Sequence, residues 1–231
     1  MSPITHARNR PEVPSPSVPG DDLLGRAREV SAALGVASLL LQQMLDHSPP
    51  TVAHSLRVAR LAALVAAHLP PGSDGVTLAA GWPSAVYAAA LAHDTGKLRV
   101  PLSILTAPRR LTPGERAIIE RHPDDGADLI RAASAASAAS TGVSRLLVEA
   151  ACGHHERWDG GGYPNHLTGC ATPLIARLIG LCDAYDAMRE DRPYRPPLSH
   201  DAAVLEVVHG SGSQFDPALV AVVLDQRLLT D

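Results

Sequence analysis

Several features that would point to other classes of protein are scarce in this chain of 231 residues. The three cysteines are scattered and form no CxxC pair, which predicts no disulfide framework and favours a reducing, cytoplasmic setting. No apolar stretch is long enough for a signal peptide or a membrane span. The formal net charge is only -4, so nothing in the overall charge favours DNA or RNA as a partner.

Alternating apolar and polar runs of useful length are also missing, whereas apolar residues recur at helical spacing along most of the chain. The sequence therefore predicts an all-α fold, and a hydrophobic fraction of 45% is enough to build its core. Thr112, Pro113 and Glu115 form a capping box that starts one of the helices. The Ala/Ser-rich stretch 132–139 fits either a helix or a loose surface segment. Helices are expected at about 21–46, 51–69, 84–95, 112–122, from 123 on, 143–155, 174–188, 199–209 and from 216 on.

Histidine is unusually frequent in this sequence, with eleven copies, and it is the commonest metal ligand in proteins. Five of them fall at helix ends or on inward helix faces, and two aspartates accompany them: His54, His93, His122, His154, His155, Asp94 and Asp183. Asp183 follows the apolar run 178–182, where an isolated buried charge is too costly, so it must be paired or bind a metal. A single inward histidine such as His54 is more often an ordinary core residue, and the set as a whole favours ligands.

Nitrogen and oxygen ligands without thiolate point to Fe, Mn or Zn. If one carboxylate bridges, five imidazoles and two carboxylates fill two metal sites. A pair of metals can activate water and hold phosphate oxygens, so phosphodiester hydrolysis is the predicted reaction. Cys152 and Cys182 lie near the ligands and are interpreted as small buried residues.

Several motifs in a fixed order resemble one known family. They are HDTGK at 93–97, HHERWDGGGYP at 154–164, the run from 173 through Asp183 to RPYR at 192–195, and GSQFDP at 212–217. Together they are similar to the HD-GYP branch of the HD phosphohydrolases, and the resemblance covers about 51–224. It implies an HD-domain helical bundle with a Gly-rich GYP loop that hydrolyses cyclic di-GMP to linear pGpG, to GMP or to both.

The resemblance also implies roles for individual residues. Asp94 is the bridging carboxylate and, with Lys97, is assigned to catalysis. Lys97, Arg192 and Arg195 match basic positions that contact the substrate phosphates. Tyr163 is expected either to stack on a guanine of the substrate or to contact a partner, and the loop of Gly162, Tyr163 and Pro164 is a candidate contact for a diguanylate cyclase. The implied metal ligands are His54, His93, Asp94, His122, His154, His155 and Asp183.

Two departures from the family pattern matter. Members with three metals carry a glutamate one helical turn before the first histidine, where this sequence has Pro50. We therefore expect two divalent ions, Fe or Mn first, with Zn, Mg and Ni as further candidates. The second departure is the lack of a sensory domain, so we expect no covalently attached receiver to regulate the chain.

The predicted organisation is a flexible tail at 1–20, a helical extension at 21–50 and the catalytic domain at 51–231. Two other functions fit the same motifs. The centre could act on another substrate, such as the mixed GMP-AMP ring or a nucleotide monophosphate, or the domain could sense the dinucleotide or bind a partner without turnover. No membrane, DNA or RNA partner is expected, and a dimer is considered.

Overall fold

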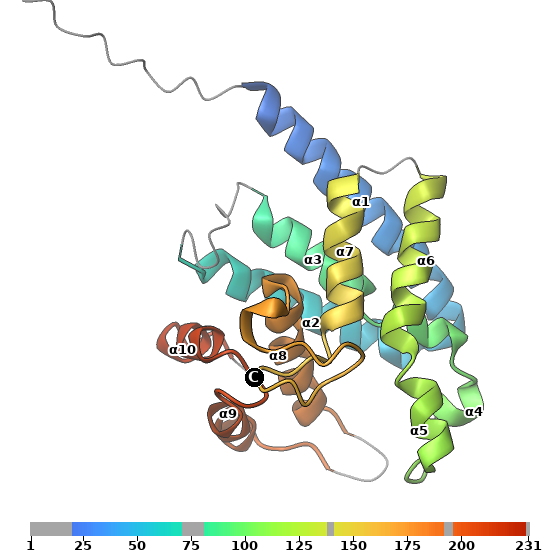
Figure 1. The fold of residues 1–231 in the computed structure, drawn as a ribbon, viewed down its shortest axis with the longest axis vertical. Coiled ribbons are helices and arrows are strands. Elements are labelled where there is room, and N and C mark those ends of the chain that lie inside the picture. Colours follow the sequence, from blue (N-terminus) through green and yellow to red (C-terminus); the bar gives the residue numbers. More distant parts are fainter. Residues whose placement is uncertain (1–19, 71–80, 138–140, 192–195, 230–231) are drawn as a thin grey trace, which may run out of the picture.

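A computed structural model describes residues 20–70, 81–137, 141–191 and 196–229, and within this part the fold is a bundle of helices without a β-sheet (Figure 1). The predicted all-α class is therefore confirmed. The expected tail at 1–20 lies almost wholly outside the described residues. The helices are α1 (Gly20–His47), α2 (Pro49–His68), α3 (Trp82–Ala92), α4 (Leu102–Leu105), α5 (Pro113–Ile119), α6 (His122–Ala136), α7 (Thr141–Gly153), α8 (Leu174–Arg189), α9 (His200–His209) and α10 (Pro217–Asp225), with short 3₁₀ turns η1 (Thr95–Arg99) and η2 (Gly169–Ala171).

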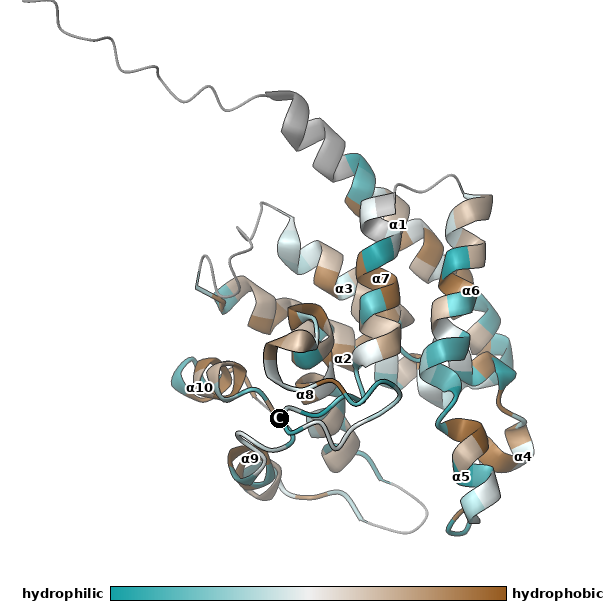
Figure 2. Cartoon of the chain, in the orientation of Figure 1, coloured by the Kyte–Doolittle hydropathy of each residue, from teal (hydrophilic) through white to brown (hydrophobic). Residues whose placement is uncertain are grey.

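The pair α2 and α3 forms the centre of the bundle, and both helices are largely hydrophobic (Figure 2). The α3 segment from 88 to 92 is almost completely buried. Because alanine has a small side chain, helices can approach it closely from several sides, and α1, α2 and α7 all pack on α3. The buried face of α2 carries Val58, Ala62 and Val65, as its apolar stripe predicts.

Several helix ends differ from the sequence-based prediction. The first helix ends at His47, close to the predicted 46, but the next one begins earlier than expected. Pro49 and Pro50 occupy the first turn of α2, where proline is tolerated because its missing N–H has no helical partner. The helix expected to reach residue 95 stops at Ala92, and the chain continues into η1. His122 was expected to end the capping-box helix and instead opens α6.

Other local predictions are confirmed. The Thr112 hydroxyl accepts a hydrogen bond from the Glu115 N–H, and the Glu115 carboxylate accepts one from the Thr112 N–H. The helices expected from 199 and from 216 begin there, with Ser199 and Asp216 capping α9 and α10 through their side chains. The open question at 132–139 resolves to helix as far as Ala136. Among the described residues, no helix combines the length and apolar character needed to cross a bilayer.

Candidate metal centre

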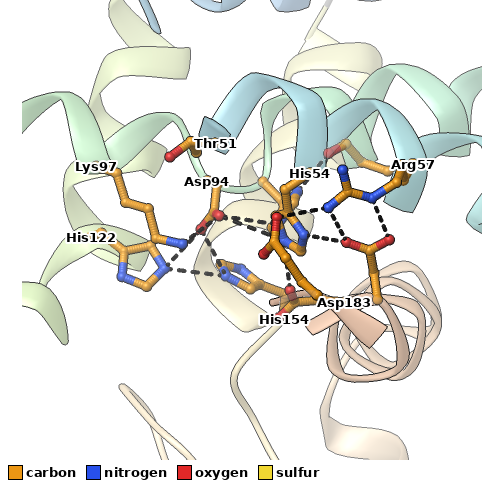
Figure 3. Close-up of polar contacts among 12 residues, drawn as sticks. Thr51, His54, Arg57, Asp94, Lys97, His122, His154 and Asp183 are labelled. Carbon is orange, nitrogen blue, oxygen red and sulfur yellow. Dashed lines mark hydrogen bonds and ion pairs between the residues drawn. The ribbon is translucent and has the colours of Figure 1, made fainter. Parts of the chain in front are cut away.

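The seven predicted side chains converge on one place in the bundle, although they come from distant parts of the sequence. Figure 3 shows five of them: His54, Asp94, His122, His154 and Asp183. His54 projects from α2, and Asp183 from α8. His93 and Asp94 lie at the junction of α3 and η1. His122 opens α6, and the histidines at 154 and 155 follow the end of α7.

The close packing of η1 on α6 brings Asp94 and His122 together. A Cβ atom at Gly96 would lie 1.9 Å from the backbone oxygen of His122 and 2.5 Å from the backbone nitrogen of Gly126. Only glycine fits this approach without moving a backbone. The glycine in the HDTGK motif therefore sets the spacing between the two segments that carry these ligands.

Two of the groups of possible ligand atoms contain six of the seven predicted side chains. The three-histidine cluster consists of His122, His154 and His155, and the mixed cluster consists of His54, His93 and Asp183; within each, the ligand atoms lie within 4.8 Å of one another. His93 and the histidine at 154 are almost completely buried, whereas the Asp183 side chain is 16% exposed. Both clusters are able to hold a metal ion, because imidazole nitrogen and carboxylate oxygen are ordinary metal ligands.

Asp94 lies between the two clusters and turns one oxygen to each. Its Oδ1 atom is 3.3 Å from Nε2 of His122, and its Oδ2 atom is 3.5 Å from Nε2 of His93. Oδ2 also lies 3.9 Å from Nε2 of His54 and 2.5 Å from Nζ of Lys97. One carboxylate is thus placed to serve both clusters.

The proton positions on three of the imidazoles follow from their contacts. The Nδ1–H groups donate to backbone carbonyls, because a carbonyl can only accept. The distances are 2.6 Å from His93 to Ala90, 2.7 Å from His122 to Ile119, and 2.9 Å from His154 to Ala151. In the neutral imidazoles this leaves Nε2 as a bare acceptor facing the centre of the site.

These acceptors have too few donors around them. Nε2 of His122 and Nε2 of His154 are 3.2 Å apart, and with both rings neutral neither can donate. Nε2 of His93 and Oδ1 of Asp94 are buried and have no hydrogen-bond partner among the described residues. Buried acceptors facing one another are costly unless a positive charge satisfies them, so the donor set fits a cation.

The electrostatics support the same interpretation. Burial lowers the pKa of His122 to about 3, and it also lowers the pKa values of His154 and His155. Burial opposes the charged form of Asp94, but nearby Lys97 and the surrounding histidines outweigh it and hold the pKa of that carboxyl well below its usual range. The three-histidine cluster therefore offers neutral imidazoles beside the ionised carboxylate of Asp94, and these are the protonation states that bind metals.

The Gly-rich loop folds back onto the site from one side. The Glu156 carboxylate accepts hydrogen bonds from the backbone N–H groups of Asn165 and Leu167 at 2.7 and 3.1 Å, which fixes the loop. The Tyr163 ring stacks on His155 with 4.8 Å between ring centroids. A cavity of about 240 Å³ opens beside this stack and is lined by Asp183, Trp158 and Gln214 among others.

Sequence reasoning missed three residues beside the site. Asp186, one turn after Asp183 on α8, accepts a hydrogen bond from Nδ1 of His54 at 2.7 Å. Arg57, one turn after His54 on α2, donates two hydrogen bonds to the same carboxylate. Glu156 lies within the quoted motif at 154–164, but no role was predicted for it. The i, i+3 spacing of both helix pairs was visible in the sequence and could have flagged the first two.

The remaining expected site residues divide into two sets. Lys97 reaches the centre and keeps 22% of its side chain exposed. Gly162 is buried, and Pro164 is half-buried in the loop. Arg192 and Arg195 lie outside the described residues. Cys182 is buried as expected, whereas Cys152 is only partly buried and its thiol donates a hydrogen bond to Asp124.

Comparison with known proteins identifies the class to which this fold and site belong. The HD domain family model matches residues 40–219. The chain therefore belongs to the HD domain family. The resemblance to the HD-GYP branch is confirmed by its relatives. A cyclic di-GMP phosphodiesterase of Vibrio cholerae serotype O1 is 36% identical over 206 residues, covering 88% of this chain and 42% of that protein.

A second relative from the same organism carries a different substrate in its name. This 3'3'-cGAMP-specific phosphodiesterase 2 is 33% identical over 133 residues, covering 58% of this chain and 24% of that protein. An HDG"Y"P protein from Bdellovibrio bacteriovorus has the same fold, with a TM-score of 0.55 at 18% identity over 76% of this chain and 52% of that one. The chain spans less than half the length of the curated relatives it matches.

Proposed function

We propose that this chain is a metal-dependent phosphodiesterase that hydrolyses cyclic di-GMP to linear pGpG, GMP or both. The observation that carries the proposal is the position of Asp94, with one oxygen toward each of two clusters able to hold a metal. Relatives named cyclic di-GMP phosphodiesterases support the choice of substrate.

The geometry of the two clusters supports an assignment of the metal ligands. We assign one divalent ion to His122, His154 and His155 and the other to His54, His93 and Asp183, with Asp94 shared between them. Nitrogen and oxygen donors without thiolate favour Fe or Mn, with Zn, Mg and Ni as further candidates. Pro50 lies exposed in the first turn of α2 and offers no ligand atom, which supports two ions rather than three.

The residues of the chain bind and polarise the substrate around this centre. Bound divalent cations supply an activated water and neutralise charge on the phosphate. Lys97 places its ammonium group beside Asp94, where it adds a positive charge for the non-bridging phosphate oxygens. The cavity beside His155 takes part of the dinucleotide, with Tyr163 on its wall. The assignment of Arg192 and Arg195 to the substrate stays a prediction.

The proposal extends to the domain limits and partners of the chain. We assign 51–231 to the catalytic unit and 21–50 to a helical extension; the described part of that extension packs on α2 and α3. The loop of Gly162, Tyr163 and Pro164 is proposed as a contact for a diguanylate cyclase. A cytoplasmic location and a dimeric state both stay predictions.

An activity assay tests the proposal. The protein is incubated with cyclic di-GMP and Mn²⁺ or Fe²⁺ under low oxygen, and the products are separated by chromatography. We expect linear pGpG or GMP from the wild type and none from Asp94→Ala, whereas Asp128→Ala, at an exposed ion pair with Arg131, stays active. Intact substrate with every metal would contradict the main proposal.

One alternative substrate is favoured by a specific observation, the relative named as specific for 3'3'-cGAMP. The same assay with that ring separates the two functions, since faster cleavage of 3'3'-cGAMP would assign the chain to it. Binding of cyclic di-GMP by a metal-loaded sample without turnover would instead indicate a sensor.

A further inference from the structure

Four of the five imidazoles of the centre are held by two different kinds of hydrogen bond. Three of them sit at helix ends, where the last carbonyl groups of a helix have no helical partner. Each uses such a carbonyl, three residues earlier in the chain, as acceptor for its Nδ1–H. The pairs are His93 with Ala90 of α3, His122 with Ile119 of α5, and His154 with Ala151 of α7.

His54 cannot form this kind of hydrogen bond, because it lies inside α2. The carbonyl groups one turn before it already accept the N–H groups of the helix. Its Nδ1 instead meets Oδ2 of Asp186 at 2.7 Å, a partner 132 residues further along the chain on α8. Its Nε2 then faces the mixed cluster, 2.9 Å from Oδ1 of Asp183.

Asp186 is itself held in place. Arg57 donates from Nε to Oδ1 at 2.8 Å and from Nη2 to Oδ2 at 2.9 Å, a two-bond fork that fixes the plane of the carboxylate. Nη2 also donates to Glu190 at 2.9 Å. The Asp186 side chain is 12% exposed, so this fork sits at the edge of the buried site rather than in open solvent.

We propose that Asp186, clamped by Arg57, is the positioning residue for His54, directing its Nε2 lone pair at the ion of the mixed cluster. This inference rests on the metal centre proposed above. Partners that hold the second nitrogen of a ligating histidine fix its tautomer and ring orientation. Here the clamp also joins α2 to α8, the two helices that carry His54 and Asp183.

Asp186 also belongs to another group of possible ligand atoms. Ligand atoms of His54, Asp186 and Glu190 lie within 4.8 Å of one another and could form a separate cation site. However, the guanidinium of Arg57 hydrogen-bonds to both carboxylates, so a fixed positive charge already serves them. A metal ion placed there would be repelled by that charge.

Metal affinity tests the positioning role. The full chain is equilibrated at graded free Mn²⁺ against a chelator, and bound metal is counted by mass spectrometry. In Asp186→Ala we expect one of two ions to bind about 10- to 100-fold more weakly while the other is unchanged. Asp186→Asn keeps an oxygen acceptor for Nδ1–H and recovers part of the loss. Asp128→Ala, at a distant exposed ion pair, is the matched control.

The Arg57→Gln variant adds a second readout. We expect a smaller loss at the same ion, and no further loss when it is combined with Asp186→Ala, because the two residues act as one unit. Arg57 is 45% exposed, so this variant is expected to fold even if Asp186→Ala does not.

The outcomes separate the two proposals. A wild type that binds no metal contradicts the proposed centre itself. Two ions bound with wild-type affinity in both variants would overturn the positioning role alone. Three ions in the wild type and two in Asp186→Ala would make Asp186 a ligand instead.

Discussion

The two clusters of the centre use the same ligand, imidazole, in opposite electrostatic settings. In the three-histidine cluster, burial lowers the pKa of His122 to about 3, so this ring is neutral at ordinary pH. In the mixed cluster, burial also opposes the charge on His54, but hydrogen bonds to Asp183 and Asp186 outweigh it and raise that pKa to about 9.

The difference shows that a ligand set cannot be judged from residue types alone. An ion entering the three-histidine cluster meets rings that are already unprotonated. An ion entering the mixed cluster must displace a proton from His54, and it gains the attraction of the carboxylates in return. Nearby carboxylates, rather than burial, therefore distinguish the two halves of the site.

Removal of one imidazole from the three-histidine cluster should change metal binding there and leave the mixed cluster unchanged. In His122→Gln we expect bound metal to fall from two ions to one, with the mixed cluster still occupied. Activity on cyclic di-GMP should fall by more than about 100-fold. Removal of a residue that only supports a metal ligand costs up to about 100-fold, and removal of a ligand itself should cost more. Metal counting and product chromatography measure both effects. His209→Gln, at an exposed histidine of α9, is expected to change neither.

The backbone contact under the three-histidine cluster gives the next largest effect. In Gly96→Ala the new methyl group would overlap the backbone oxygen of His122, and we expect the free energy of unfolding to fall by at least about 1–3 kcal/mol. Urea unfolding measures the loss. Gly114→Ala is the matched control, because a Cβ there meets nothing within 4 Å. Equal stability of the two variants would contradict this packing.

Stability of the metal-free protein against pH sharpens the electrostatic contrast. His54 has a raised pKa, so its contribution is present below about 6.5 and is lost as pH rises toward about 9. His122 has a lowered pKa, so its contribution is present above about 6.5 and is lost as pH falls toward about 3.

Urea unfolding between about pH 5 and 9.5 separates these two limbs. We expect His54→Gln to flatten the alkaline limb and His122→Gln to flatten the acid limb. If both variants kept the wild-type pH profile, the assigned protonation states would be wrong.

The sequence predicts one part of the site better than the other. Convergence of the seven ligands was predicted because several long motifs stand in a known order. The Asp186–Arg57 clamp was not, because it depends on how α2 and α8 are rotated against each other, which helical periodicity does not determine. The proline pair at 49–50 shows a similar limit, since proline fits both the end of one helix and the first turn of the next.

Tyr163 gives the smallest expected effect and tests whether the loop supports the three-histidine cluster. Its ring lies on His155 at an interplanar angle of 27°. Tyr163→Phe keeps the stack, so metal affinity should stay within about twofold of the wild type. Tyr163→Ala removes the stack, worth about 0.5–1.5 kcal/mol, and should weaken one ion by up to about tenfold.

The two variants separate the aromatic ring from its hydroxyl group. If Tyr163→Phe loses activity while still binding both ions, the hydroxyl group contacts the substrate. The role of Tyr163 in activity would then lie in its hydroxyl group and not in the stacking of its ring on His155. If Tyr163→Ala keeps both affinity and activity, the stack supports nothing, and the loop is left with partner contact as its role. A loss confined to the ion at the three-histidine cluster would show that the GYP loop supports one half of the centre, as the Asp186–Arg57 clamp is proposed to support the other.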